Sequence, residues 1–207
     1  AAIKAVKEGR FSIRANEITP IDDEIEFRPE QKEAIEKTVR KFQSGGKTML
    51  WNAKMRFGKT LTALQLFKEL SQAEPKQYRR MLILTHRPVV NDGWFDDFHK
   101  IFFEVATPYM YGSKTSGNSF QNLEAKLKAD KECRYVYFAS IQDLRGSSFV
   151  GGKFQKNDEL FSAHWDLLVI DEAHEGTQTD LGDKVLKALI KKGTKTLSLS
   201  GTPFNLF

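Results

Sequence analysis

Residues 48–66 read TMLWNAKMRFGKTLTALQL, and this stretch decides the fold. Thr48–Trp51 is a short apolar run typical of a buried strand, and the leucines from Leu61 to Leu70 recur at helical spacing. Between them, Ala53–Thr60 fits the phosphate-loop pattern G-x-x-x-x-G-K-[ST] except at its first residue. In such a loop, backbone N–H groups surround a phosphate, the lysine reaches its oxygens and the hydroxyl holds Mg²⁺. The order strand, loop, helix also places a helix N-terminus, where anions bind, beside the loop.

A second Gly-Lys-Thr, at Gly46–Thr48, lacks this context. Apolar residues at helical spacing predict a helix that begins near Pro29 and ends at Gly45-Gly46. Proline is tolerated in the first turn of a helix. A strand follows it directly. The second Gly-Lys-Thr is therefore interpreted as the end of a helix and not as a phosphate site.

The rest of the chain alternates strand-like and helix-like patterns, which predicts an α/β fold with a mostly parallel central sheet and helices on both faces. Further strands are predicted at 81–85, 135–140, 167–170 and 196–200, because near-continuous apolar runs are typical of parallel strands buried on both faces. Further helices are predicted at 89–103, 122–127 and 181–190, and surface loops at 112–118 and 146–158. Residues 1–26 fit least well and are predicted to be an N-terminal extension packed on the core.

The composition excludes several classes of protein. Of the 207 residues, 40% are hydrophobic and 29% charged, which is ordinary for a globular protein with a sizeable core. No run approaches the ~18 apolar residues of a membrane span, and the first residues lack the apolar centre of a secretory signal. The single cysteine, Cys133, excludes an internal disulfide and a cysteine-based zinc cluster, and it fits a reducing compartment. We therefore expect a cytoplasmic protein with no membrane partner. The net charge of +5 permits a polyanionic partner without establishing one.

Acidic residues follow directly after the predicted strand Leu167–Ile170, in the sequence Asp171-Glu172-Ala173-His174. A carboxylate at the C-terminal tip of a parallel strand lies at the edge where open α/β sheets bind ligands. Asp171 is suited to hold Mg²⁺, and Glu172 is suited to polarise the water that attacks a γ-phosphate. Alone, an acidic pair after a strand is more often a helix cap or a loop charge. Its pairing with a phosphate loop over 100 residues upstream, in the right order, favours a nucleotide site.

In combination, these motifs resemble the first RecA-like motor domain of the DEAH group in helicase superfamily two, over roughly residues 27–207. Asp171–His174 is the box that gives the group its name. The resemblance implies ATP and Mg²⁺ as cofactors. It assigns catalytic roles to Lys59, Asp171, Glu172 and His174, and it makes Thr60 and Asp171 the ligands of Mg²⁺.

The resemblance also assigns residues that bind the nucleotide. In this family a glutamine upstream of the phosphate loop reads the adenine edge, and Phe27–Gln31 is similar to that motif, with Gln31 as the reader and Phe27 or Arg28 beside the base. The segment is equally a helix N-terminus with proline in its first turn, and the two interpretations are compatible. The nucleotide-binding set is then Phe27, Arg28, Gln31, Ala53, Arg56, Phe57, Gly58, Lys59 and Thr60.

Three further segments at strand ends resemble family motifs. Two of them are similar to motifs that contact the phosphate backbone of nucleic acid, and such contacts do not read the base sequence. Ordinary polar loop residues are an equal alternative for these segments. The third, Ser200–Pro203, resembles the S-G-T-P motif that couples nucleotide state to nucleic-acid binding, and is otherwise simply a turn. The residues implied for nucleic acid are Thr85, His86, Arg87, Ser140 and Gln142, and those for coupling are Ser200 and Thr202.

The phosphate loop departs from the family pattern at Met55 and Arg56, where threonine and glycine are usual. A positive φ at Arg56 costs ~1–2 kcal/mol more than at glycine. We therefore expect either that the empty loop has a different shape or that Arg56 reaches solvent or a phosphate. If the departure weakens nucleotide binding, the alternative function is a nucleic-acid-binding module whose ATPase motifs have decayed.

The resemblance implies that the chain is the ATP-binding half of an ATP-dependent DNA helicase or translocase, most like the motor subunits of type III and type I restriction enzymes. An RNA helicase domain is the alternative within this class. In this family a second RecA-like domain closes over ATP and supplies an arginine finger, and we expect it downstream of Phe207. The fragment alone should bind ATP weakly and hydrolyse it slowly or not at all. A nuclease or methyltransferase partner is left open.

Overall fold

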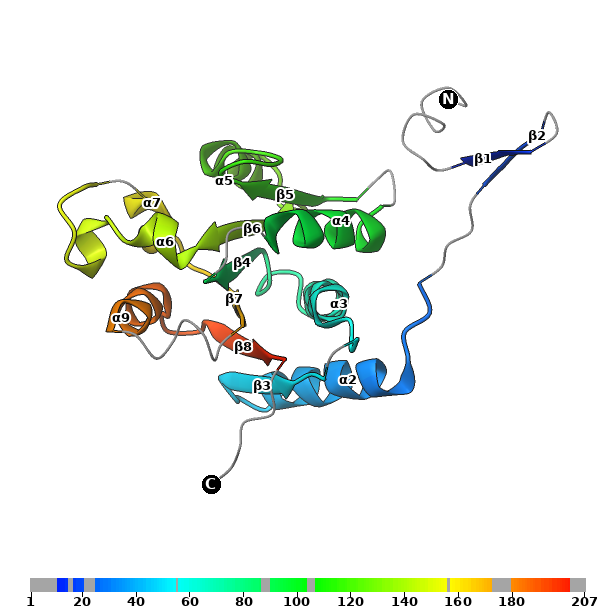
Figure 1. Ribbon diagram of the computed structural model, residues 1–207, viewed down its shortest axis with the longest axis horizontal. Helices are drawn as coiled ribbons and strands as arrows, with labels where there is room; N and C mark the ends of the chain where they lie inside the picture. Colours follow the sequence, from blue (N-terminus) through cyan, green and yellow to red (C-terminus); the bar gives the residue numbers. More distant parts are fainter. Residues whose placement is uncertain are drawn as a thin grey trace.

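A six-stranded, all-parallel sheet forms the centre of the molecule (Figure 1). The predicted α/β class with a parallel central sheet is therefore confirmed. Its strands, in spatial order, are β3 (Thr48–Asn52), β8 (Lys195–Ser200), β7 (Leu167–Asp171), β4 (Arg80–Thr85), β6 (Arg134–Ser140) and β5 (Tyr109–Ser113).

The computed structural model describes only part of the chain in full. The described residues are 25–54, 56–86, 90–103, 107–155, 157–172 and 180–201, with the backbone alone at 11–14 and 17–20. The predictions made for Met55, Arg87, His174 and Thr202 lie outside these residues.

Helices cover both faces of the sheet, as predicted (Figure 1). On one face lie α2 (Pro29–Gln43), α3 (Lys59–Ala73) and α4 (Asn91–Ile101). On the other lie α5 (Phe120–Ala129), α6 (Ile141–Leu144), the 3₁₀ turn η2 (Ser148–Val150), α7 (Asp158–Ser162) and α9 (Asp180–Leu189). Across the described ranges, no helix is both long enough and apolar enough to pass through a bilayer.

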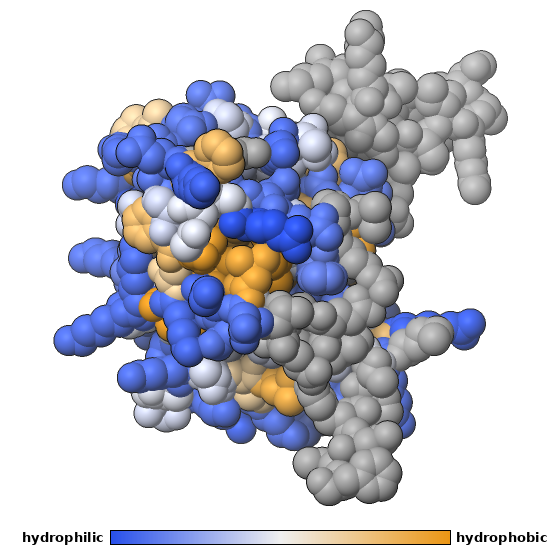
Figure 2. All heavy atoms as spheres, turned by 60° about the vertical axis from the view of Figure 1, so that its left-hand side comes forward, coloured by the Kyte–Doolittle hydropathy of each residue, from blue (hydrophilic) through white to orange (hydrophobic). Residues whose placement is uncertain are grey.

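Side chains of the central strands alternate between two hydrophobic cores, as the two-residue period of a strand requires. In β4, Met81 and Ile83 pack under α3 and α4, whereas Leu82 and Leu84 pack under the helices of the other face. Both faces are buried, which is why the strand has a continuous apolar sequence. The outer surface on the side of α5, α6, α7 and α9 is mostly hydrophilic, with a hydrophobic area near its middle (Figure 2).

The N-terminal segment contains two short strands, β1 (Phe11–Arg14) and β2 (Glu17–Pro20). They pair with each other in antiparallel fashion, and neither belongs to the six-stranded sheet. The packing of residues 1–26 on the core stays a prediction.

The sequence analysis missed β5, α6 and α7, and it wrongly placed Gly112 and Ser113 in a loop although they end β5. β5 is a five-residue edge strand, and a glycine inside so short a strand weakens its pattern. Glycine is needed there because a Cβ on Gly112 would lie 2.3 Å from the carbonyl oxygen of Asn118. The predicted loop 146–158 contains η2 and the first residue of α7. The other predicted elements differ from the observed ones only at their ends.

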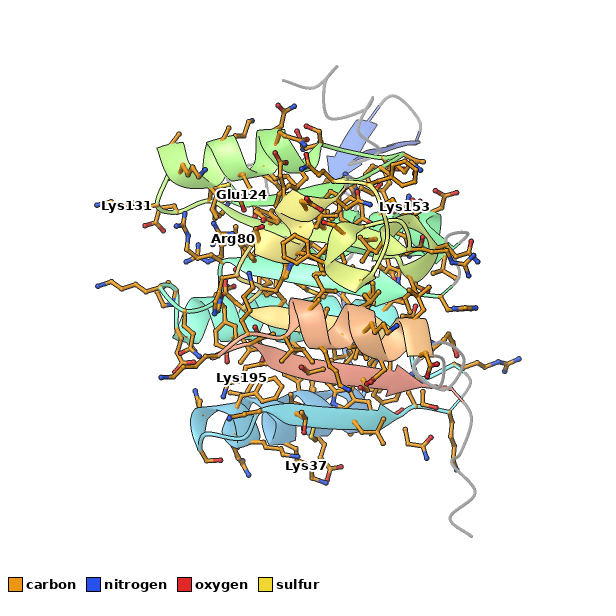
Figure 3. The ribbon with its side chains drawn as sticks, turned by 90° about the vertical axis from the view of Figure 1, so that its left-hand side faces the viewer. Lys37, Arg80, Glu124, Lys131, Lys153 and Lys195 are labelled. Atoms are coloured by element: carbon orange, nitrogen blue, oxygen red, sulfur yellow. The ribbon has the colours of Figure 1, made fainter. Side chains whose placement is uncertain are left out.

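An ion pair joins β4 to α5 at the end of the sheet away from the phosphate loop, and Figure 3 labels both partners. Arg80 donates to Glu124 through Nε at 2.7 Å and Nη2 at 3.1 Å, and the Tyr135 hydroxyl donates to the same carboxylate at 2.5 Å. Burial alone would raise the pKa of Glu124, but these donors outweigh it and hold the pKa below its ordinary value of 4.5.

Replacing Glu124 by glutamine should lower the free energy of unfolding by about 1–3 kcal/mol near neutral pH, the usual contribution of hydrogen bonds to a charged group. A carboxyl whose pKa is lower in the folded protein adds stability above the unfolded pKa and loses it as the pH falls through the folded pKa. Chemical denaturation from pH 7 down to pH 3 should therefore show the gap between the wild type and Glu124→Gln closing below about pH 4.5. A gap that stayed constant with pH would contradict this. Glu33→Gln, which removes an exposed ion pair with Lys37, is the control and should change little.

Candidate nucleotide-binding site

The predicted site residues lie at the carboxyl edge of the sheet. In the strand register, Thr85 of β4 is paired with Asp171 of β7 on one side and with Ser140 of β6 on the other. Asn52 of β3 is paired with Ser200 of β8, and β8 lies between β3 and β7. Because every strand of this sheet is parallel, the loops that follow β3, β7 and β8 meet at one edge, the ligand-binding edge of open α/β sheets.

Lys59, the first residue of α3, brings the phosphate loop and the acidic residues together. Its ammonium nitrogen lies 3.1 Å from Asp171 Oδ1 and donates a hydrogen bond to Glu172 Oε1. Burial alone would lower the pKa of Lys59, but the two carboxylates outweigh it and raise the pKa above its usual value. Lys59 is therefore a cation at neutral pH, held between two acids that stand more than a hundred residues away in the sequence.

Asp171 and Glu172 differ in their surroundings. Asp171 ends β7 and is 3% exposed, and its Oδ2 accepts a hydrogen bond of 3.0 Å from the indole N–H of Trp94. Among the described residues, its Oδ1 has only the Lys59 ammonium, at 3.1 Å, as a polar partner. Glu172 has a left-handed backbone with φ of +54°, a conformation that costs about 1–3 kcal/mol for a residue other than glycine and that concentrates at functional sites.

Arg28 and Gln31 hold the phosphate loop through its carbonyl groups. Arg28 Nη2 donates to the carbonyl oxygens of Arg56 and Phe57, each at 2.6 Å. Gln31 Nε2 donates to the Phe57 carbonyl at 2.8 Å and to the Thr62 hydroxyl at 3.0 Å, while Oε1 accepts the Arg28 N–H at 2.8 Å. Gln31 is 5% exposed, and both hydrogens of its amide are used inside the protein. In this structure Gln31 positions the loop, and its contact with adenine stays a prediction.

Two residues of the loop have a left-handed backbone. Gly58 has φ of +74°, and a Cβ there would lie 2.9 Å from Gln31 Nε2, so glycine is required. Arg56 has φ of +71° although it is not glycine. Its side chain is exposed, and the Arg28 hydrogen bond to its carbonyl group helps to offset the strain. The sequence left two outcomes open, a different loop shape or an Arg56 side chain that reaches solvent or a phosphate. In this structure the Arg56 side chain reaches solvent, and its backbone is left-handed.

The N-terminus of α3 is suited to an anion. Its N-cap is Gly58, which has no side chain to accept hydrogen bonds from the first-turn N–H groups. With no capping side chain at Gly58, these groups and the positive end of the helix dipole suit a bound phosphate. Phe27, also expected beside the nucleotide, packs at the edge of the first core.

Thr60 and Asp171 fit a magnesium ion that binds together with a nucleotide. Both present oxygen atoms, the ligands that Mg²⁺ prefers, and the only partner of the buried Oδ1 of Asp171 among the described residues is the Lys59 ammonium, which phosphate oxygens can take over. Within the described ranges, no three His, Cys, Asp or Glu side chains gather into a metal cage. A site of one carboxylate, one hydroxyl and substrate phosphates is the usual arrangement for Mg²⁺.

The segment expected to couple nucleotide state to nucleic acid begins beside these groups. The carbonyl oxygen of Ser200 accepts the N–H of Ala53 at 2.8 Å, which ties the end of β8 to the start of the phosphate loop. A Cβ on Gly201 would lie 3.9 Å from Glu172 Oε1, an ordinary contact distance. The end of β8 is therefore adjacent to both the loop and Glu172.

The residues expected to contact nucleic acid differ in exposure. Thr85 and Ser140 are buried, and the Ser140 hydroxyl caps α6 by accepting the Asp143 N–H and donating to Asp143 Oδ2. Gln142 is exposed. His86 is partly exposed, and its Nδ1 is buried without a partner among the described residues. Contact with nucleic acid stays a prediction at all of them.

The sequence analysis did not single out Trp94 and Asp97, both in α4. Trp94 is hydrogen-bonded to Asp171, and Asp97 Oδ2 accepts a hydrogen bond from the hydroxyl of Thr60. The signal in the sequence was weak, because Trp94 belongs to the buried stripe of an ordinary amphipathic helix and Asp97 lies beside that stripe.

A family model and several solved structures match this chain. Residues 24–205 match the family described as "Type III restriction enzyme, res subunit". No curated protein sequence matches the chain.

Solved structures with a similar fold include three DNA-related or helicase proteins. The SWI2/SNF2 ATPase core of Sulfolobus solfataricus in complex with dsDNA is 20% identical with a TM-score of 0.59, over 86% of this chain and 32% of that one. A nuclease-deletion mutant of the Type ISP restriction-modification enzyme LlaGI, in complex with a DNA substrate mimic, is 19% identical with a TM-score of 0.61, over 86% of this chain and 18% of that one. The UvsW helicase from bacteriophage T4 is 16% identical with a TM-score of 0.56, over 98% of this chain and 61% of that one.

This chain therefore spans less than two thirds of each of those chains. The likeness to them shows the fold, whereas the family match extends over nearly the whole sequence. The chain belongs to the family of type III restriction enzyme res subunits, and its fold is that of the RecA-like motor domain of superfamily-two helicases.

Proposed function

We propose that this domain is the ATP-binding half of an ATP-dependent DNA helicase or translocase, the motor of a restriction-modification or related DNA-processing enzyme. The observation that carries the proposal is the meeting of Lys59 with Asp171 and Glu172 at the N-terminus of α3. An ammonium group, two carboxylates and free helix N–H groups at one sheet edge are the parts that phosphoryl transfer needs. The sequence Asp171–His174 favours the DEAH group.

Each side chain has a role that its chemistry supports. Lys59 exchanges its carboxylate partners for β- and γ-phosphate oxygens, beside the N–H groups of the first turn of α3. Thr60 and Asp171 would hold Mg²⁺, which would neutralise phosphate charge when bound. Glu172, released from Lys59, orients the water for in-line attack. Arg28 and Gln31 hold the Phe57 carbonyl group of the loop in place through their hydrogen bonds.

The activity of the complete motor depends on groups beyond this domain. A second RecA-like domain that follows in a longer chain would close over the nucleotide and supply an arginine finger, a group that contributes about 10³–10⁵-fold to phosphoryl transfer in related systems. We therefore propose that the domain alone binds ATP weakly and hydrolyses it slowly or not at all. A nuclease or methyltransferase partner fits a restriction enzyme, and a cytoplasmic location fits the single, buried Cys133.

DNA is favoured over RNA because two of the similar structures are described with DNA or a DNA mimic. The test is to titrate ATP with Mg²⁺ into the chain by calorimetry, and then to measure ATPase activity when the chain is joined to a second RecA-like domain. Duplex DNA should stimulate hydrolysis more strongly than RNA does. Equal or greater stimulation by RNA would support the RNA helicase alternative, and absence of ATP binding would support a module with decayed motifs.

A further inference from the structure

Two hydrogen bonds from a single helix reach the two residues that would hold Mg²⁺. The Trp94 indole N–H donates to Asp171 Oδ2 at 3.0 Å, and Asp97 Oδ2 accepts a hydrogen bond from the Thr60 hydroxyl. Trp94 and Asp97 stand three residues apart in α4, so they leave the helix on the same face. Asp171 ends β7 and Thr60 lies in the first turn of α3, so α4 contacts both sides of the site.

The direction of each bond decides which lone pairs remain available. Trp94 occupies Oδ2 of Asp171, while the only partner of Oδ1 among the described residues is the Lys59 ammonium at 3.1 Å, which would move to the phosphates when a nucleotide binds. Thr60 has one hydroxyl hydrogen and gives it to Asp97, so the lone pairs of its oxygen stay free for a cation. Both contacts leave oxygen lone pairs available where a metal needs them.

Packing alone does not account for this choice of partners. A buried tryptophan usually finds some acceptor, and Trp165 finds one in the carbonyl of Leu160 at 2.8 Å. Trp94 instead gives its N–H to the carboxylate at the ligand-binding edge of the sheet. The side chain of Asp97 is 18% exposed, and its Oδ1 lies 3.4 Å from the Lys100 ammonium. Its Oδ2 accepts a hydrogen bond from the Thr60 hydroxyl.

We propose that Trp94 and Asp97 are positioning residues for Mg²⁺, which fix the orientations of Asp171 and Thr60 before the nucleotide binds. The inference rests on the function proposed above. Neither residue touches the metal or the phosphates; each acts through the ligand to which it is hydrogen-bonded. Outer partners of metal ligands typically contribute 10–100-fold to metal affinity.

The experiment measures metal affinity directly, with Mn²⁺ as the spectroscopic substitute for Mg²⁺. Electron paramagnetic resonance of free Mn²⁺, in the presence of ADP and the chain, gives the apparent Kd for the metal. Trp94→Phe keeps a smaller aromatic ring and removes the indole N–H, and Asp97→Ala removes the acceptor. Each should weaken Mn²⁺ binding by about 10-fold or more and leave the affinity for ADP without metal unchanged. Asp97→Asn keeps an oxygen acceptor and should stay closer to the wild type.

Trp165→Phe is the matched control, because it removes an indole N–H from an equally buried tryptophan in the other core. Thermal unfolding of each variant shows how much each change costs in stability. If Trp94→Phe and Trp165→Phe lower Tm alike and leave Mn²⁺ affinity unchanged, Trp94 is structural and the inference is overturned. Asp97 is partly exposed, so its replacement by alanine does not put the fold at risk. If Asp97→Ala bound Mn²⁺ as tightly as the wild type, the positioning role of Asp97 would be overturned. Failure of the wild type to bind ADP at all would overturn the proposed function, and the inference with it.

Discussion

Replacing Lys59 by alanine should weaken ATP binding to the chain by about 10–100-fold and remove ATP hydrolysis in any longer protein that contains it. The magnitude is that of losing a charge-assisted hydrogen bond to the triphosphate, about 1.5–3 kcal/mol, where each 1.4 kcal/mol is tenfold in affinity. In this structure the ammonium of Lys59, the first residue of α3, lies between Asp171 and Glu172. Without it, two carboxylates would face the triphosphate and repel it. Calorimetric titration with ATP and Mg²⁺ measures the loss.

A matched control lies in the same sequence. Lys47 belongs to the second Gly-Lys-Thr, which ends α2 and opens β3, and its side chain is exposed. Lys47→Ala should therefore bind ATP as the wild type does. Because alanine at 59 leaves the buried Asp171 without its cation, a change that can destabilise the fold, Lys59→Arg is a second variant. It keeps a charge beside the acids and should fold, yet its planar fork does not replace a compact ammonium, so ATP binding should still fall. ATP binding by a folded Lys59 variant at wild-type strength would contradict the assignment.

The meeting of Lys59 with Asp171 could be predicted from the sequence because two strong rules combine. One is a motif whose spacing requires a strand before it and a helix after it, and the other is the common edge at which parallel strands end. The contacts of Trp94 and Asp97 could not be predicted in the same way. They depend on the rotation of α4 against α3 and β7, and side-chain packing sets that rotation while leaving no separate motif in the sequence.

The same reasoning explains the differences around the phosphate loop and β5. The motif residue Gln31 was identified, but the present structure uses its amide to hold the Phe57 carbonyl, a backbone contact that no sequence pattern specifies. Arg56 was expected to resist a positive φ, and tertiary contacts from Arg28 overrode that local preference. β5 was missed because a short edge strand that ends near Gly112 carries few of the β-branched residues by which strands are identified.

Replacing Glu172 by glutamine should separate binding from chemistry. Glutamine has nearly the same shape, so the left-handed turn at this position and the contacts around it should persist. It cannot serve as a carboxylate that polarises water, so single-turnover hydrolysis should fall by about 10²–10³-fold. ATP affinity should stay the same or become tighter, because Lys59 loses one of the two carboxylates that it must leave in order to bind phosphate. This pattern is the opposite of that expected for Lys59→Ala, which loses binding itself.

Two measurements on the same preparation test the separation: calorimetric ATP affinity, and the rate of a single turnover in a protein that carries the second RecA-like domain. Glu124→Gln is the control, since its carboxylate is also partly buried and ion-paired but lies far from the phosphate loop, beside Arg80. It should cost stability and leave the turnover rate unchanged. If Glu172→Gln hydrolysed ATP at the wild-type rate, the water would have to be oriented by another group. If it lost ATP binding as Lys59→Ala does, Glu172 would serve the nucleotide site by holding Lys59 in place. The assignment of Glu172 to orienting the attacking water would then be wrong.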